Sequence, residues 1–232
     1  MELSYMEVRQ QICDVCYKMW QTGIVAANDG NVSVKLEDGT ILCTPTGISK
    51  GMVTPISLVR TDLEGNILEA YEGYRPSSEM KMHYRCYLER EDVNAVVHAH
   101  PPVATTFAAA NMALDDYVIT ENVVNMGAVP VAPLAIPSTD EVPDSIAPLL
   151  EHHDAMLLAH HGALTVGPTL MAAYYKMESV EQYAKTSLYL RLLGGAPDIP
   201  EDKIHTLIGL REKYKSTGRH PGYVKYNQPE KE

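Results

Sequence analysis

The sequence predicts an α/β fold, an α/β/α sandwich whose central sheet is mainly antiparallel and carries helices on both faces. Hairpin-type turns at 37–39 and 62–66 indicate antiparallel neighbours, because tight turns join adjacent strands that run in opposite directions. Helical patterns alternate with strands along the rest of the chain, which places helices in layers beside the sheet. A doubly wound nucleotide-binding fold is disfavoured, because no strand leads into a glycine-rich phosphate motif.

The individual elements follow from periodicity and turn chemistry. Apolar residues three or four apart predict a first helix that ends near Gly23, where glycine can take a left-handed conformation. Alternation over 32–36 predicts a strand, and Pro168 suits the start of the longest helix. The predicted helices are 3–22, 79–89, 102–111, one opening at 138–141, 168–193 and 201–214, and the predicted strands are 32–36, 40–43, 57–61, 67–70, the run ending at His100, 129–133, the run ending at His161, and 163–166.

Length and composition indicate a single domain over residues 1–232. The chain has 232 residues, of which 45% are hydrophobic, and this is ample for one large core but short for two. The polar stretch from about residue 216, which contains Gly218, Pro221 and Gly222, is expected to form a flexible C-terminal tail.

Charge and cysteine content exclude several classes of partner and location. The 19 basic and 30 acidic residues give a formal net charge of −11, and no basic run suggests a nucleic-acid groove. No segment has the length of a membrane span or the pattern of an export signal, so we expect a soluble protein without a membrane partner. Four scattered cysteines make no disulfide framework, which fits a reducing cytoplasm, and Cys13 and Cys16 lie in a helical pattern as ordinary helix residues.

A metal site is predicted where an apolar run ends in two histidines. Side chains alternate across a strand, so His98 and His100 project from one face while Val97 and Ala99 point to the other. A lone pair of this kind is more often a packing or surface feature. However, Glu79 lies on the first turn of a predicted helix, and a second apolar strand ends at the adjacent pair His160 and His161, of which only one can face a site. Three histidines and a carboxylate at element ends suit Zn²⁺ or a similar divalent ion.

Three turns have the chemistry of a phosphate cradle. They contain small hydroxyl and amide side chains, glycines that allow close backbone approach, and free N–H groups at a helix start. Taken singly, each is by default an ordinary turn or cap. Ser78 adjoins Glu79, which ties one turn to a candidate metal ligand, and this predicts a phosphorylated substrate beside a metal. The turns are Gly30-Asn31, Thr44-Pro45-Thr46-Gly47 and Ser77-Ser78.

Taken together, the motifs resemble the class II sugar-phosphate aldolase and epimerase superfamily, in its fuculose-1-phosphate aldolase branch. The resemblance covers nearly the whole chain, and it implies the class II aldolase-like fold. The superfamily also includes ribulose-5-phosphate 4-epimerase, rhamnulose-1-phosphate aldolase, a methylthioribulose-1-phosphate dehydratase and the metal-free head domains of adducins. The motifs are Gly30-Asn31-Val32-Ser33-Val34, Thr44-Pro45-Thr46-Gly47, Pro76-Ser77-Ser78-Glu79, Val97-His98-Ala99-His100 and His160-His161-Gly162.

The resemblance assigns roles to matching positions. It implies that His98, His100 and His161 bind Zn²⁺, or another divalent ion such as Mn²⁺ or Co²⁺, and that Glu79 is both a ligand and the base. His83, one helical turn after Glu79, is expected to be a supporting or packing residue. A homotetramer of C4 symmetry with sites between subunits is also implied. The matching phosphate positions are Gly30, Asn31, Thr46, Gly47, Ser77 and Ser78.

The residue that acts as the second acid or base stays open. Where relatives place a tyrosine from a neighbouring subunit, this chain has Ile119, with Tyr117 two residues earlier. Glu121 matches a position where many relatives have glutamate, although a solvated loop carboxylate is an equally good interpretation. The C-terminal Tyr223 and Tyr226 compete for the same role.

The resemblance implies a lyase of carbohydrate metabolism that acts on a small phosphorylated sugar. The expected reaction is zinc-dependent reversible aldol cleavage of a ketose 1-phosphate, L-fuculose 1-phosphate or a related deoxy-ketose 1-phosphate, to dihydroxyacetone phosphate and an aldehyde. The rivals are a pentulose-5-phosphate 4-epimerase, whose motif has aspartate where this chain has Glu79, and a methylthioribulose-1-phosphate dehydratase. An adducin-like interaction module is disfavoured, because all four ligands are present.

Overall fold

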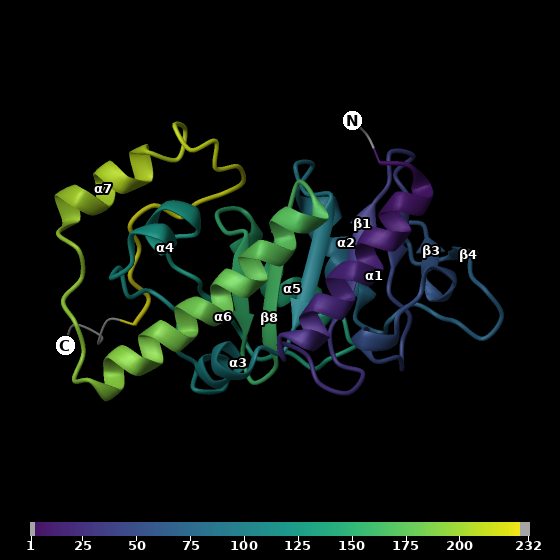
Figure 1. Ribbon diagram of the computed structural model, residues 1–232, viewed down its shortest axis with the longest axis horizontal. Coiled ribbons are helices and arrows are strands. Elements are labelled where there is room, and N and C mark those ends of the chain that lie inside the picture. Colours follow the sequence, from purple (N-terminus) through teal and green to yellow (C-terminus); the bar gives the residue numbers. More distant parts are fainter. Residues whose placement is uncertain (1–2, 228–232) are drawn as a thin grey trace.

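The computed structural model describes residues 3–227, in which helices are interspersed among the strands (Figure 1). The strands are β1 (Asn31–Lys35), β2 (Ile41–Cys43), β3 (Val59–Thr61), β4 (Ile67–Glu69), β5 (Ala95–Ala99), β6 (Val131–Ala132), β7 (Ala155–Leu158) and β8 (Gly162–Gly167). The helices are α1 (Tyr5–Gln21), α2 (Met80–Glu89), α3 (Pro102–Ala109), α4 (Thr120–Asn125), α5 (Glu141–Leu150), α6 (Leu170–Leu192) and α7 (Glu201–Gly209), with short 3₁₀ helices η1 (Lys50–Met52) and η2 (Pro55–Ser57).

Within residues 3–227, eight strands make one sheet in the order β4-β3-β2-β1-β5-β8-β7-β6. The β6–β7 pair is parallel, and the other neighbouring pairs are antiparallel. The predicted mainly antiparallel sheet is therefore confirmed. The strand β5, which ends just before His100, lies between β1 and β8 in the middle of the sheet.

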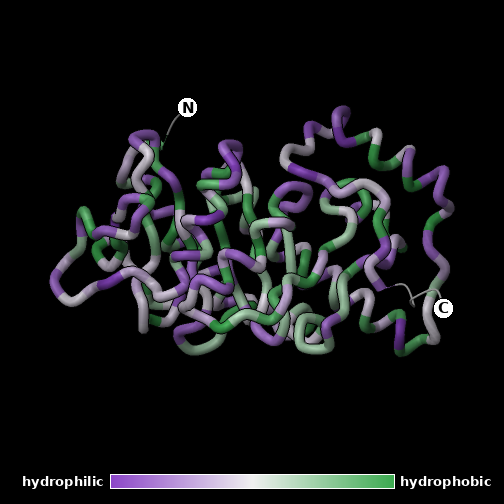
Figure 2. Tube along the Cα trace, turned by 180° about the vertical axis from the view of Figure 1, so that it is seen from behind, coloured by the Kyte–Doolittle hydropathy of each residue, from purple (hydrophilic) through white to green (hydrophobic). Residues whose placement is uncertain are grey.

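Helices cover both faces of this sheet, as the sequence predicts. On one face α1, α3 and α6 bury residues such as Ile12, Phe107 and Val180, and on the other α2 and α5 bury Met82 and Ile146. Figure 1 shows α1 and α6 in front of the strands and α2 and α5 behind them. Viewed from behind, hydrophobic segments run through the centre and hydrophilic residues are frequent on the outer turns (Figure 2). Two apolar layers around one sheet explain why strands such as β5 and β7 are buried on both faces.

The alternation along β5 decides which layer each of its side chains enters. Val97 and Ala99 pack with α1, α3 and α6, whereas Val96 packs in the layer of α2 and α5. His98 follows the same alternation as Val96 and therefore points toward the side of α2. This packing confirms the prediction that His98 avoids the face of Val97 and Ala99, and the ring of His100 lies 5.0 Å from that of His98, measured between centroids.

Several element boundaries differ from the prediction. The six-residue helix α4 was not predicted, because Thr120–Asn125 contains two β-branched valines and is too short to show a helical period. The strand expected to reach His161 ends at Leu158, since His160 has a positive φ of 56° and the chain turns there. The last helix ends at Gly209 rather than near 214.

The C-terminal segment packs against the end of the sheet that carries β6 and β7. Arg211 donates to the carbonyl oxygens of Val124 and Gly218 at 2.6 and 3.1 Å, and Asp115 accepts the backbone N–H groups of Tyr226 and Asn227 at 2.6 and 2.8 Å. These bonds give residues 216–227 a defined course, while the predicted flexibility of this tail stays a prediction. None of the helices that the structure describes has the length and apolar character needed to cross a membrane.

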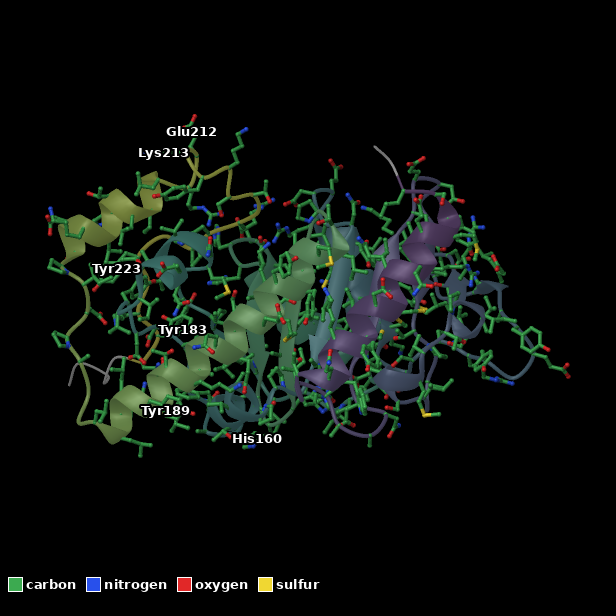
Figure 3. All side chains as sticks on the ribbon, in the orientation of Figure 1. His160, Tyr183, Tyr189, Glu212, Lys213 and Tyr223 are labelled. Carbon is green, nitrogen blue, oxygen red and sulfur yellow. The ribbon has the colours of Figure 1, made fainter. Side chains whose placement is uncertain are left out.

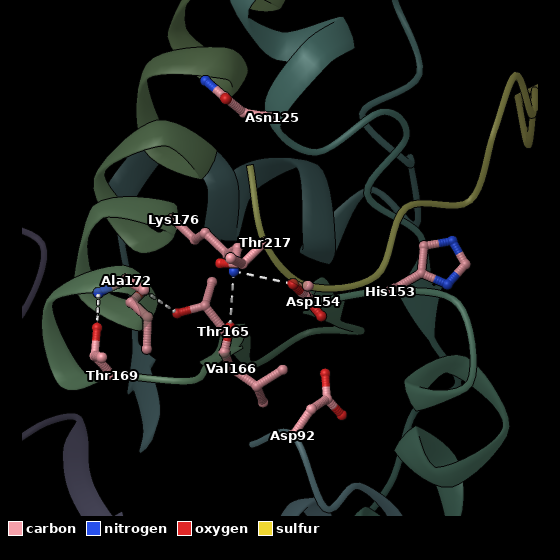
Figure 4. Close-up of polar contacts among 12 residues, drawn as sticks. Asp92, Asn125, His153, Asp154, Thr165, Val166, Thr169, Ala172, Lys176 and Thr217 are labelled. Carbon is pink, nitrogen blue, oxygen red and sulfur yellow. Dashed lines mark hydrogen bonds and ion pairs between the residues drawn. The ribbon is translucent and has the colours of Figure 1, made fainter. Parts of the chain in front are cut away.

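A buried ion-pair network lies where this tail meets the sheet. Asp154, just before β7, accepts from Arg90 at 2.6 Å and from Lys176 of α6 at 2.9 Å, and the Lys176 ammonium also donates to the Val166 carbonyl oxygen (Figure 4). Gly218 passes so close that an added Cβ would overlap the Asp154 carboxylate. Because two cations pair with one buried carboxylate, the network is a structural junction between sheet, α6 and tail.

Candidate metal centre and phosphate cradle

Strand pairing places a cradle residue directly across from a histidine. In the antiparallel pair of β1 and β5, Asn31 lies opposite His98. Gly30, just before Asn31, has a φ of 76°, and an added Cβ would lie 2.9 Å from the His98 carbonyl oxygen and 2.7 Å from Val25. Only glycine fits this conformation and this space. The register of two central strands thus brings the first turn of the cradle to the predicted metal ligands.

The turn between β7 and β8 delivers the third histidine. The His161 N–H donates to the Leu158 carbonyl oxygen at 2.9 Å, and Gly162 then begins β8 so close to β5 that a Cβ would overlap the Ala99 carbonyl oxygen. The ring of His161 lies 4.7 Å from that of His98 and 5.0 Å from that of His100, measured between centroids. His160 is exposed, bonds through its N–H to Ala108 and lies beside α3 (Figure 3).

Glu79 joins the histidines from the start of α2. Its Oε2 lies 3.2 Å from the Nε2 of His98 and 3.3 Å from the Nε2 of His161. Burial by itself raises the pKa of Glu79, but the hydrogen bond with His98 and the charges of His98 and His161 outweigh it and lower the pKa to about 2. The N-cap of this helix is Glu79 itself, and the Ser77 Oγ accepts the Glu79 N–H at 3.3 Å.

The donor set fits a divalent metal ion. Among the described residues, His98, His100 and His161 have ligand atoms that all lie within 4.8 Å of one another. The His98 Nδ1 lies 2.9 Å from the Ala163 carbonyl oxygen, which can only accept, so Nδ1 donates there and Nε2 is the nitrogen that faces the cluster. Burial lowers the pKa of His161 to about 4 and also lowers that of His100, which keeps both imidazoles neutral and able to bind a metal.

The three predicted cradle turns come together beside this cluster. The Asn31 Nδ2 donates to the Ser77 Oγ at 3.3 Å, and the Thr46 N–H donates to the Arg75 carbonyl oxygen at 2.9 Å. A bridge between Pro45 and Pro76 joins the same two segments. Gly47 has a φ of 75°, and nothing lies within 4 Å of a Cβ built there, so its backbone is open to a ligand. Thr46, Gly47 and Ser78 lie at the mouth of the cradle, where each is at least partly exposed.

His83 fixes the amide of Asn31 from the buried side. Its Nε2 lies 2.5 Å from the Asn31 Oδ1, and its Nδ1 lies 2.7 Å from the Ser33 Oγ. Because the Asn31 oxygen accepts from His83, the Nδ2 of the same amide is aimed at Ser77. Burial, with a smaller effect of the charge on His98, lowers the pKa of His83 to about 3. The prediction of a supporting role for His83 is confirmed.

Asp29 is a residue of this site that the sequence did not single out. Its Oδ2 lies 3.4 Å from the His100 Nδ1, so it can orient the ring of His100. In the sequence Asp29 stands in an Asn-Asp-Gly-Asn run, which predicts only a turn. No local signal distinguishes it, since its partner lies 71 residues further along the chain.

The structure does not bring the candidate second acids to the histidines. The Tyr117 side chain is 1% exposed, and its hydroxyl donates to the Val224 carbonyl oxygen at 2.9 Å and accepts the Val224 N–H at 3.0 Å. Burial raises the pKa of Tyr117 to about 12. Glu121 is exposed on α4, where its Oε2 accepts the Thr120 hydroxyl at 2.8 Å. Their catalytic roles stay predictions, and within one subunit neither contacts the cluster.

The two C-terminal tyrosines are also engaged elsewhere. Tyr223 packs against Tyr117, with ring centroids 4.8 Å apart, in the region of α4 and α7 (Figure 3). The Tyr226 hydroxyl lies 2.8 Å from the His153 Nε2. The four candidates for the second acid therefore lie in the region of α4, α7 and the C-terminal segment. The candidate metal-binding histidines lie at the ends of β5 and β7.

Comparison with known proteins decides the family. Residues 10–188 match the family described as the class II aldolase and adducin N-terminal domain. The chain belongs to this family. It is 32% identical over 212 residues to the L-fuculose phosphate aldolase of Escherichia coli strain K12, covering 91% of this chain and 96% of that protein. It is 30% identical over 194 residues to a 3-oxo-tetronate 4-phosphate decarboxylase of E. coli O6:H1, covering 82% and 89%.

Solved structures of class II aldolases have the same fold. An L-fuculose 1-phosphate aldolase superposes with a TM-score of 0.82 at 29% identity, over 92% of this chain and 98% of that one. The L-fuculose-1-phosphate aldolase of Thermus thermophilus gives a TM-score of 0.72 at 32% identity, over 83% and 98%. The predicted fold class and family resemblance are confirmed, and this class II aldolase family member is a metal-dependent lyase.

Proposed function

We propose that this class II aldolase family member cleaves a ketose 1-phosphate, L-fuculose 1-phosphate or a related deoxy-ketose 1-phosphate, reversibly to dihydroxyacetone phosphate and an aldehyde. The observation that carries the proposal is the position of Glu79. Its carboxylate contacts His98 and His161, and the same short segment supplies Ser77 and Ser78 to the cradle. The carboxylate of Glu79, a proton acceptor, therefore follows directly in the chain after Ser77 and Ser78, which would hold the substrate phosphate.

Zn²⁺ is the metal that the donor set favours, held by His98, His100 and His161 with Glu79 as a fourth ligand. When bound, such an ion would polarise the substrate carbonyl and stabilise the negative charge that develops next to it. Neutral imidazoles and an ionised carboxylate match this role at physiological pH, given the lowered pKa values of His161 and Glu79. Mn²⁺ or Co²⁺ is the alternative occupant.

The residues of this chain perform the remaining steps. The cradle turns would hold the 1-phosphate through Asn31, Ser77 and the open backbone at Gly47. In cleavage, a base takes the proton of the C4 hydroxyl, the C3–C4 bond breaks, and its electron pair stays at C3 beside the carbonyl. Glu79, which takes up a proton from solvent once it has moved away from the histidines, then delivers that proton to C3, and in the condensation direction its carboxylate removes it.

The group that serves the C4 oxygen is proposed to come from another subunit. Glu121 is exposed on α4 and free to approach a neighbour, whereas the Tyr117 hydroxyl is already bonded on both sides to Val224. We therefore place Glu121 ahead of Tyr117 in a homotetramer of C4 symmetry with sites between subunits. Light scattering after size exclusion should give four times the 25.6 kDa of the chain, and a monomer would remove Glu121 from the site.

The experiment that tests the proposed function is a substrate panel assayed for released dihydroxyacetone phosphate. The metal-loaded protein is incubated with L-fuculose 1-phosphate, L-rhamnulose 1-phosphate and methylthioribulose 1-phosphate, and dihydroxyacetone phosphate is measured by its NADH-coupled reduction. We expect NADH oxidation with at least one ketose 1-phosphate and none with the Glu79→Gln variant. Ribulose 5-phosphate and 3-oxo-tetronate 4-phosphate belong in the same panel, because epimerisation or loss of CO₂ would need the same stabilised electron pair.

The outcomes separate the alternatives. Interconversion of pentulose 5-phosphates without dihydroxyacetone phosphate would replace the aldolase by the 4-epimerase. Release of CO₂ from the 3-oxo acid would favour the activity named for the E. coli O6:H1 relative. Dehydration of methylthioribulose 1-phosphate would favour the dehydratase. A protein that neither binds metal nor turns over any of these compounds would favour an interaction module.

A further inference from the structure

A fully buried lysine lies beneath the phosphate cradle. Lys50, the first residue of η1, is 1% exposed. Its ammonium donates to the carbonyl oxygen of Asn28 at 3.0 Å and to that of Ile48 at 2.9 Å. Among the residues that the structure describes, no carboxylate lies within ion-pair distance of this ammonium, although lysines this deeply buried are normally paired.

The environment of Lys50 disfavours a charge that has no counter-ion. Burial lowers the pKa of Lys50, and the nearby Cys16 thiol and the negative charge of Asp29 offset this only in part. The Asp29 carboxylate itself faces His100, with 3.4 Å between its Oδ2 and the Nδ1 of that ring. The ammonium therefore has two carbonyl dipoles and a distant carboxylate as partners, which leaves most of the cost of burying the charge uncompensated.

The two carbonyl groups that Lys50 contacts belong to two different turns of the cradle. Asn28 stands two residues before Gly30, and Ile48 directly follows Gly47. One ammonium thus joins the turn that carries Asn31 to the turn that carries Thr46. The six predicted phosphate residues, Gly30, Asn31, Thr46, Gly47, Ser77 and Ser78, contribute no positive charge of their own.

We propose that Lys50 is a positioning residue for substrate binding: it clamps two turns of the cradle together and supplies the fixed positive charge whose counter-ion is the phosphate dianion of the substrate. The proposal rests on the proposed function only in assuming a phosphorylated ligand at the cradle. A dianion bound by the backbone at Gly30 and Gly47 would lie over the same two turns that the ammonium holds from below. Ligand charge would then compensate a buried cation that is unpaired in the free protein.

The competing interpretation is that Lys50 only holds the two turns together and has no effect on phosphate binding through its charge. Two substitutions distinguish this interpretation from the proposal. In Lys50→Gln the side chain is one bond shorter but keeps two N–H donors for the Asn28 and Ile48 carbonyl oxygens, and the charge is gone. In Lys50→Met both the donors and the charge are gone. Lys203→Gln is the matched control, because it makes the same change in net charge on α7, where the Lys203 side chain is 68% exposed.

The test is the dissociation constant of inorganic phosphate, measured by calorimetry on the full metal-loaded protein and again after chelation, so that binding to the metal is separated from binding to the cradle. We expect Lys50→Gln to weaken the metal-independent binding by about tenfold or more, which corresponds to about 1.4 kcal/mol. Lys203→Gln should stay within about twofold of the parent. Lys50→Met should bind no more tightly than Lys50→Gln.

Two results would overturn the proposal. One is phosphate affinity in Lys50→Gln within about twofold of the parent, which would leave Lys50 as a clamp only. The other is a parent protein that shows no metal-independent phosphate binding. Neither depends on aldol chemistry: a parent that cleaves no ketose 1-phosphate but binds phosphate through Lys50 refutes the proposed function alone, and normal cleavage with unchanged phosphate affinity in Lys50→Gln refutes this inference alone.

Discussion

Replacing Glu79 by glutamine separates metal binding from proton transfer at one position. Glutamine has the size of glutamate and keeps one oxygen toward His98 and His161, whose Nε2 atoms lie 3.2 and 3.3 Å from the Glu79 Oε2. Three imidazoles remain, so the metal should stay bound. The amide cannot accept a proton, however, and the step at C3 of dihydroxyacetone phosphate loses its base.

The expected loss follows from the environment of the carboxylate. With a pKa of about 2, Glu79 is a weak base while it contacts both histidines, and it becomes effective only after it moves away from them. A lost general base typically lowers a rate by about 10² to 10⁴, which is about 3 to 5 kcal/mol of activation free energy. We expect the exchange rate of the C3 proton to fall by this factor in Glu79→Gln, with metal content close to one per chain.

The assay is deuterium incorporation into dihydroxyacetone phosphate in heavy water, followed by NMR without any aldehyde. In the condensation direction deprotonation at C3 precedes carbon–carbon bond formation, so the parent should exchange its C3 proton. Equal exchange in the parent and in Glu79→Gln would show that Glu79 is only a ligand and that the base lies elsewhere. Metal analysis of both proteins is the control, since loss of metal would lower exchange for another reason.

Three further predictions test the cluster, the cradle and the buried support. His98→Ala and His161→Ala should each lose most of the bound metal and the activity, because each removes one of three converging imidazoles; full metal occupancy by elemental analysis would contradict this. Ser77→Ala and Thr46→Ala should raise KM several-fold with metal retained, and unchanged KM in steady-state kinetics would remove both from the cradle. In the metal-free protein, burial lowers the pKa of His83 to about 3, so below its ordinary pKa of 6.5 the unfolded chain binds a proton that the folded chain does not. The free energy of unfolding should therefore fall as the pH drops from 6.5 toward 3. In His83→Gln the slope of this fall should be smaller by about 1.4 kcal/mol per pH unit. Equal slopes for the two proteins, measured by urea titration at several pH values, would refute this.

Local periodicity by itself determined much of this protein. A strand alternates with period two, so His98 and His100 had to share a face that Val97 and Ala99 avoid, and the packing agrees. Turn chemistry predicted the hairpins that make the sheet mainly antiparallel. The order of the cradle and ligand motifs indicated the family, which the comparisons confirm.

Only the tertiary structure decided how distant segments meet. The pairing of β1 with β5 sets Asn31 opposite His98, and the turn after β7 presents His161 while His160 turns toward α3. The histidine ligands come from strand ends more than 60 residues apart, and a local pattern carries no information about such a pairing. Strand register and loop closure depend on how both apolar layers pack.

The same reason explains the residues that the sequence left unassigned or assigned differently. In the sequence Lys50 is one lysine in a polar turn, and its burial beneath two cradle turns follows from the packing of η1 against α1. The Tyr117 hydroxyl is engaged by a tail segment more than 100 residues further on. Sequence determined the chemical groups and the faces they occupy, whereas the folded chain determined which groups meet, because contact between distant segments is a property of the whole packed core.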